Sequence, residues 1–240
     1  MRHVSTSSIA RASSERGSDR QIRIGGAIWA LLAIYFIAQA IAQAALTTPY
    51  SLIDNRVSDL GNTACGRGFG GAAICSPLHT VMNIGLVVTG ILILLGLLLT
   101  RRAWPKRRLT TWGAVFLGVT GVGTVLVGLS PENVNVPLHL LGALNIPCGN
   151  VGLLLLGLAN RRVNPWQGRL ALVLSVIGVL GMLSGPVLIR LFGQGGGLSE
   201  RLALYPPIVW MIMIGVAFAC SRPASGRDCS AAALAAGQAV

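Results

Sequence analysis

Residue types that could do chemistry are scarce in this chain, and several of them lie beside long apolar runs. The 240 residues include only seven acids and three histidines. Asp59, Glu132 and Glu200 each stand near the end of an apolar run or in a loop that leads into one, and His139 stands at the start of another run. Carboxyl groups whose pKa is raised by partial burial act as general acids or bases, as imidazoles do. These four residues are therefore candidate catalytic groups.

The same residue types allow two other interpretations, a metal site and a structural ion pair. His79 and His139 would be ligands in a metal-dependent hydrolase that activates water against a lipid ester, amide or phosphate. The chain has neither an HExxH nor an HxxxH spacing, so no metal motif supports that interpretation. Alternatively, a carboxylate could pair with Arg56 or Arg201 and lock the loops. The residues alone leave these alternatives open.

Polar residues that do not help a chain insert into lipid supply candidate ligand contacts. The segment 50–83 is the only long polar interval between apolar runs. A polar or ionisable residue at a membrane segment is a functional-site hypothesis by default, although amides and hydroxyls also serve as contacts between helices. The candidate ligand-binding residues are Asn55, Ser58, Asn83, Asn150, Arg201 and Tyr205.

One apolar run contains the sequence Asn-Ile-Pro-Cys-Gly-Asn at 145–150. The proline removes a backbone hydrogen bond, and the two amides can satisfy the groups that it leaves free. We therefore expect a kink or local opening there. His139, Ala143 and Asn150 share a helical face, so a polar track could run inward from the membrane surface. Repair of the proline break is the equally good alternative.

The elements that must position these residues are membrane-spanning helices. The chain is 53% hydrophobic and only 11% charged, and its mean hydropathy is +0.69, outside the range of soluble domains. A span needs about 20 apolar residues as a helix. Six runs meet this length, near Ile24–Leu46, Val81–Thr100, Thr111–Leu129, Leu138–Ala159, Leu170–Leu191 and Leu202–Cys220. We predict an all-α, integral membrane six-helix bundle, since none of the runs alternates as a barrel strand would.

The basic residues indicate an orientation. The formal charge is +12, but threading six helices puts every Lys and Arg on one side except Arg56, Arg67, Arg190 and Arg201. This positive-inside bias predicts a plasma-membrane protein with both termini cytoplasmic. Short basic clusters at span ends, without interleaved aromatics, indicate contact with membrane lipids and argue against a nucleic-acid partner.

The remaining segments divide into tails and an outer loop. Residues 1–21 and 221–240 are expected to be disordered cytoplasmic tails around a membrane domain at 22–220. Cys65 and Cys75 lie in one outer loop that faces an oxidising space, so we expect a disulfide between them.

Several motifs carry a resemblance to a known family. They are Ser58-Asp59-Leu60-Gly61-Asn62-Thr63 with Cys65, Cys75-Ser76-Pro77 with His79, Pro131-Glu132-Asn133 with His139, and Glu200-Arg201 with Tyr205-Pro206. In this order they resemble bacterial membrane proteins of the domain of unknown function 998 family. The resemblance covers about Ala27 to Ala219 and implies a six-helix membrane domain. It implies no activity, because none is established for the family.

The sequence supports three functions in decreasing order. The first is a plasma-membrane protein whose outer polar site binds a lipid-like or small amphipathic ligand. The second is a membrane-embedded enzyme, either a lipid hydrolase with or without a metal or a terpenoid cyclase that uses acid catalysis. The third is a transporter, with Asn145–Asn150 as its candidate gate. We expect Asp59, Glu132, His139 and Glu200 to converge, because the ends of six packed helices cover a small area. No cofactor or oligomeric state is indicated.

Overall fold

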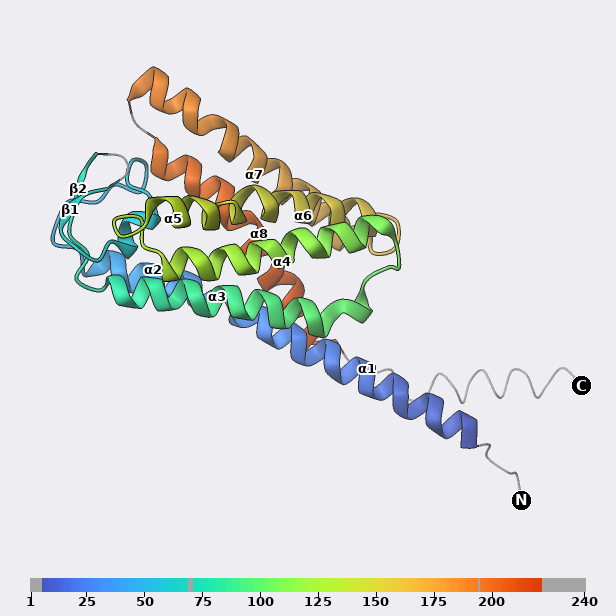
Figure 1. Cartoon of the computed structure of the whole chain (residues 1–240). Coiled ribbons are helices and arrows are strands. Elements are labelled where there is room, and N and C mark those ends of the chain that lie inside the picture. The colour runs from blue at the N-terminus through green and yellow to red at the C-terminus, as the bar shows by residue number, and fades with distance from the viewer. Residues whose placement is uncertain (1–5, 69–70, 194, 222–240) are drawn as a thin grey trace, which may run out of the picture.

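The computed structural model of the chain describes residues 6–68, 71–193 and 195–221 (Figure 1). Its helices are α1 (Thr6–Ala30), α2 (Ile34–Ala44), α3 (His79–Thr100), α4 (Arg108–Leu129), α5 (Val136–Ala143), α6 (Asn145–Asn160), α7 (Pro165–Phe192) and α8 (Gly196–Ala219). Short 3₁₀ turns are η1 (Leu31–Ala33), η2 (Ser58–Gly61) and η3 (Arg101–Ala103), and the strands are β1 (Gly66–Arg67) and β2 (Ala73–Ile74).

Within the residues that the structure describes, six helical segments are long and apolar enough to cross a membrane, which confirms the predicted six-span, all-α class. They are Gly17–Ala44, His79–Ala103, Arg108–Leu129, Val136–Asn160, Pro165–Phe192 and Gly196–Ala219. The sixth begins earlier than the hydropathy predicts, because the polar residues at 199–201 form the first turns of α8. The chain is therefore a multi-pass membrane protein in which Glu200 and Arg201 belong to a span.

The spans follow one another around a ring in chain order. α1 packs against α3, α3 against α4, α4 against α6, α6 against α7, α7 against α8, and α8 against α1. Several helices meet at glycines, where an added Cβ would strike the facing backbone; these pairs are Gly26–Gly215, Gly90–Gly121 and Gly113–Gly152. Small residues let helix backbones approach closely in a membrane, where van der Waals packing replaces the hydrophobic effect as the cause of association.

The fourth span is broken between α5 and α6, as the proline at 147 predicts. α5 ends at Ala143 and α6 begins at Asn145, so Leu144 interrupts the helix. Pro147 has no N–H for the carbonyl of Ala143, four residues earlier, and its ring crowds that carbonyl. Across the break, the Asn145 Nδ2 donates to Thr124 Oγ1 of α4 at 2.9 Å. Because of this break, α5 and α6 are separate helices within one span.

The connections between the helices lie at two opposite ends of the bundle. The loop end is formed by residues 45–78 and 130–135 and by the α7–α8 connection, and the basic end by residues 101–107 and 161–164 (Figure 1). At the loop end, β1 and β2 pair antiparallel, with Gly66 opposite Ile74. Cys65 and Cys75 flank this hairpin and are joined by a disulfide, which confirms the predicted pairing. The hairpin itself is not evident in the sequence.

The N-terminal segment differs from the prediction of a disordered tail over 1–21. The structure continues α1 back to Thr6. Extending a formed helix adds one hydrogen bond for each residue that is fixed and needs no new nucleus, and the Ala, Arg, Glu and Gln residues of this segment favour helix. The predicted C-terminal tail lies outside the described residues beyond Ser221.

Candidate functional site

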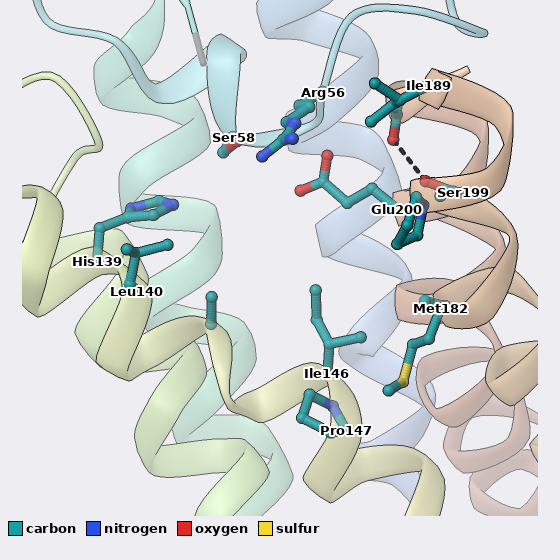
Figure 2. A pocket seen from close by; sticks show the side chains of 15 residues that line it. Arg56, Ser58, His139, Leu140, Ile146, Pro147, Met182, Ile189, Ser199 and Glu200 are labelled. Carbon is teal, nitrogen blue, oxygen red and sulfur yellow. Dashed lines mark hydrogen bonds between the residues drawn. The ribbon is translucent and has the colours of Figure 1, made fainter. Parts of the chain in front are cut away.

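A cavity of about 420 Å³ lies between α5, α6, α7 and α8 near the loop end (Figure 2). It exists because α5 packs against α4, whereas α7 diverges from α5 toward the loop end (Figure 1). Its apolar walls are formed by Leu140, Ile146, Pro147, Met182, Pro186 and Ile189. Leu140 and Ile189 are 51% and 45% exposed on the outside of the bundle. The cavity is therefore lined in part by side chains that are also exposed on α5 and α7.

His139 forms one polar wall of this cavity. The ring lies on α5 and points into the cavity (Figure 2). Its Nδ1 is 2.8 Å from the carbonyl oxygen of Ser130. Because a carbonyl can only accept, Nδ1 carries the proton, and Nε2 of the neutral ring is an acceptor. The contact fixes both the tautomer and the direction of the imidazole.

Glu200 reaches into the cavity from the opposite wall, on α8 (Figure 2). Its Oε2 accepts a hydrogen bond of 2.8 Å from the backbone N–H of Val57. Arg56 and Arg201 are both close enough to attract this carboxylate. The side chain of Arg56 points toward the same space from the loop above, next to Ser58 (Figure 2). The polar end of the cavity thus offers an anion, a cation, a hydroxyl and an imidazole.

A smaller chamber of about 40 Å³ extends from the same polar end toward the bundle axis. It shares His139, Glu200 and Ser58 with the larger cavity and adds Tyr35 and Asn145. The Tyr35 hydroxyl is buried and has no hydrogen-bond partner in the described structure. The chamber is mostly apolar, but its volume admits about one water molecule beside these polar groups.

Asp59 and Glu132 form a separate carboxyl pair at the loop end, outside the spans. Asp59 lies in η2 and Glu132 in the α4–α5 loop, and both are at least 97% buried. The Asp59 Oδ2 accepts from the Arg56 backbone N–H at 2.8 Å. Burial first, then hydrogen bonding to Glu132 and repulsion from it, raise the pKa of Asp59 to about 7. Among the main influences on this pKa, only the Arg56 N–H lowers it.

The four residues expected to converge therefore fall into two neighbouring groups. His139 and Glu200 face each other across the cavity, whereas neither Asp59 nor Glu132 lines it. The two groups contact adjacent backbone positions. Asp59 Oδ2 accepts a hydrogen bond from the Arg56 N–H, and Glu200 Oε2 accepts one from the Val57 N–H. Ser58, one of the candidate ligand-binding residues, also lines the cavity.

Arg201, also a candidate ligand-binding residue, is bound instead to the loop that follows α2. Its Nη1 donates to the carbonyls of Asn55 (2.7 Å), Leu52 (3.0 Å) and Gly197 (3.0 Å). Its Nη2 donates to the Tyr50 hydroxyl at 2.6 Å. Burial raises the pKa of Tyr50, so that neutral hydroxyl can in turn donate to the Arg56 carbonyl at 2.7 Å. The guanidinium acts as a clamp on this loop.

The other candidate ligand-binding residues also make contacts within the protein. The Tyr205 hydroxyl donates to Gln39 Oε1 at 2.9 Å. The Asn83 Nδ2 donates to the Gly61 carbonyl at 2.9 Å, and the Asn150 Nδ2 to the Ala203 carbonyl at 2.8 Å. The Asn55 Oδ1 accepts from the Ser51 N–H at 2.8 Å. These four side chains join helices and loops and do not line the cavity.

The two histidines considered as metal ligands are held on different elements. His79 begins α3, and its Nδ1 lies 2.9 Å from the carbonyl oxygen of Ser76. His79 lines neither the cavity nor the inner chamber that contain His139. Within residues 6–68, 71–193 and 195–221, no three His, Cys, Asp or Glu side chains group as ligands for a metal ion.

Comparison with known proteins identifies the family. The sequence model of DUF998, described as a protein of unknown function, matches residues 22–217, which include the spans apart from the start of the first and the last two residues of the sixth. The chain belongs to the DUF998 family. No curated protein and no solved structure matches it. The family assignment confirms the resemblance drawn from the loop motifs. Because the family is described as one of unknown function, a proposal about function has to rest on the geometry of the site.

The sequence did not point to several residues that line the cavity or the inner chamber of this DUF998 protein. Tyr35 and Met182 lie inside long apolar runs, where a single phenol or thioether gives no signal of a site. Arg56 was expected only as an ion-pair partner, yet it lines the cavity. The one usable signal was Pro186, because a proline within an apolar run marks an irregular helix surface.

Proposed function

We propose that the cavity binds one amphipathic, lipid-like molecule. The observation that carries this proposal is the cavity's division into a polar end with Arg56, Ser58, His139 and Glu200 and an apolar body between α5 and α7. Ligand pockets are commonly about 300 to 1,000 Å³, mostly apolar, with a few convergent polar groups. The polar group of the ligand would bind at the loop end, and its apolar part would lie along α6 and α7.

Entry from the membrane supports a lipid-like ligand over a water-soluble one. α7 is the least buried of the six spans, and its residues Leu183, Val187 and Leu191 are exposed on the outside of the bundle. An apolar molecule already in the lipid layer can move sideways between α5 and α7 without crossing water. The polar side chains of Arg56 and Glu200 lie at the end of the cavity near the expected level of the headgroups.

We infer from the distribution of basic residues that this site lies on the outer face of the membrane. The basic end carries five Lys or Arg residues in 101–108 and two in 161–162, and positive loops stay in the cytoplasm. The loop end, with its disulfide, would then face an oxidising space. The sidedness of both termini follows from the same rule.

Two matched thiols test the orientation. In a variant without Cys148, Cys220 and Cys229, Val134→Cys at the loop end should react with a membrane-impermeant maleimide in intact cells. Val163→Cys at the basic end should react only after permeabilisation. Both valines are well exposed, at 65% and 59%. The reverse labelling pattern would mean that the loop end faces the cytoplasm, and the site would then lie on the cytoplasmic face of the membrane.

An enzyme is the second candidate, favoured by the inner chamber. His139 and Glu200 line both the ligand cavity and the chamber, which has room for about one water. A neutral imidazole with a free Nε2 can take a proton from that water, and the carboxyl can hold or return one. This arrangement suits hydrolysis or acid catalysis on a bound lipid.

One experiment tests binding and separates the two candidates. Native mass spectrometry of protein purified from its own membrane should show a bound amphiphile. Glu200→Gln keeps the shape but removes the charge, so a binder should carry the same molecule at about tenfold lower occupancy, as expected for loss of a charged hydrogen bond. An enzyme should instead accumulate a molecule of different mass in the variant, its unconverted substrate. Absence of any bound amphiphile from the wild-type protein would contradict both.

A further inference from the structure

Three buried side chains at the loop end each have one oxygen atom without a hydrogen-bond donor. Asp59, Asn62 and Glu132 are 2%, 1% and 3% exposed. Their Oδ1, Oδ1 and Oε2 atoms, respectively, have no partner in the part of the chain that the structure describes. The opposite atoms of the same groups are all used. The Asp59 Oδ2 accepts from the Arg56 N–H, and the Glu132 Oε1 accepts from the Asn62 Nδ2 at 3.0 Å.

These three residues lie together. The Asn62 amide bonds directly to Glu132, and the Glu132 carboxyl is within hydrogen-bonding reach of Asp59. Next to them, the Thr63 N–H donates to Asn133 Oδ1 at 3.1 Å, which joins the two loops again. The backbone of Gly68 closes the site from the hairpin side, because an added Cβ there would strike Asp59 Oδ1.

Two buried carboxyl groups in contact need a positive partner. An unsatisfied oxygen of a buried charge is strongly destabilising. The Arg201 guanidinium donates to the Asn55 carbonyl and the Tyr50 hydroxyl, and the Arg56 backbone N–H already donates to the Asp59 Oδ2. A proton shared between the carboxyls would satisfy one pair of oxygens but would leave the Asn62 Oδ1, which can only accept, without a donor.

We propose that Asp59, Asn62 and Glu132 bind a hard cation, Ca²⁺ by preference, that ties η2 to the α4–α5 loop. The available ligands are all oxygen, which Ca²⁺ favours and Zn²⁺ does not. Two carboxylates match its charge of two, whereas Na⁺ would leave one negative charge. Mg²⁺ demands near-ideal octahedral geometry and keeps several waters, for which a closed site between irregular loops is poorly suited. Additional ligands would come from backbone carbonyls or water.

This site contains fewer of the usual metal-binding side chains than the centres that are recognised by residue type. It has two acids and an amide instead of three groups of the His, Cys, Asp and Glu kind. It stands apart from the proposed lipid cavity, since none of its three residues lines that cavity. The cation would nevertheless hold the loop segment at 56–58 that covers the polar end, through the bond from Arg56 N–H to Asp59.

The experiment is equilibrium dialysis of the purified full chain with radioactive Ca²⁺ at about pH 8, together with melting temperatures in chelator and in Ca²⁺. We expect one saturable site in the wild-type protein and a melting temperature that rises with Ca²⁺. Glu132→Gln and Asp59→Asn should each weaken binding at least about tenfold, since affinity at such sites follows ligand charge. Asp54→Asn changes an acid of the same loop whose side chain accepts from Ser51 and Gly195, and this variant should bind Ca²⁺ as the wild type does.

The outcomes separate the cation from a shared proton. If the wild-type protein binds no Ca²⁺ at about pH 8, or if Glu132→Gln binds it equally well, the proposal is wrong. A melting temperature that Ca²⁺ does not change would mean that only a shared proton joins the two carboxyl groups, which also overturns the proposal. The dialysis of the wild-type chain decides the matter even if both variants fail to fold. Neither result depends on whether the cavity binds a lipid.

Discussion

Replacing Arg201 with alanine should lower the free energy of unfolding by about 3 to 5 kcal/mol, the loss typical of breaking a buried charged network. The guanidinium is 7% exposed and donates to three carbonyls and to the Tyr50 hydroxyl. It also lies over the Tyr50 ring, 5.6 Å from the centroid. Alanine would leave these carbonyls without donors and release the loop after α2. Lysine should recover only part of the loss, because an ammonium cannot reproduce the planar fork.

Thermal unfolding in detergent measures the effect, and limited proteolysis within 50–56 reports the loop. Arg190→Ala is the matched control, since Arg190 is an exposed arginine in the last turn of α7. We expect the control to unfold at the wild-type temperature and Arg201→Ala well below it. Equal melting temperatures for the two variants would mean that the clamp contributes nothing to stability, and Arg201 would return to the list of candidate ligand groups.

The architecture was predictable because lipid imposes a simple rule on the backbone. A spanning segment must satisfy its own hydrogen bonds, so length and hydropathy suffice to find each helix. The break before Pro147 followed from the chemistry of proline, and the disulfide between Cys65 and Cys75 from their position in a single loop. The hairpin was not predictable, because strands of two residues contain no usable alternation.

The site was predictable in its residue types but not in its grouping. Glu200 and Arg201 are neighbours in sequence, yet a helix turns by about 100° for each residue. Glu200 consequently faces the cavity, while Arg201 faces the loop after α2. The rotation of α8 depends on its contacts with α1 and α7, which are not encoded in any local pattern. For the same reason, hydropathy could not separate the Asp59–Glu132 pair from the cavity.

Amides inside the membrane were the hardest residues to interpret. Asn150 has the composition of a binding residue, but its Nδ2 bonds the Ala203 carbonyl of α8. The Ser175 hydroxyl of α7 donates to the Asn150 carbonyl at 3.0 Å, so three helices meet there. A sequence shows that such an amide needs a partner; it does not show whether the partner is a ligand or the protein backbone.

Filling the cavity should have the largest effect on ligand binding. Ala143 lines both the main cavity and the inner chamber, so Ala143→Phe would place a ring where the ligand meets the polar end. We expect occupancy by the amphiphile to fall at least about tenfold, because overlap with a bound molecule cannot be relieved in a close-packed interior. Ala40→Phe, on the exposed face of α2, makes the same chemical change away from the cavity and should leave occupancy unchanged.

The most direct test of ligand binding is photo-crosslinking of the protein in phospholipid vesicles with a diazirine-labelled fatty acid, followed by mapping of the labelled residues. The proposed function predicts saturable labelling concentrated on Leu140, Met182 and Ile189, competed by unlabelled amphiphile, lost in Ala143→Phe and retained in Ala40→Phe. Labelling spread evenly over lipid-facing residues such as Leu180 and Leu183, without saturation and unchanged in Ala143→Phe, would contradict a lipid-binding cavity in this protein.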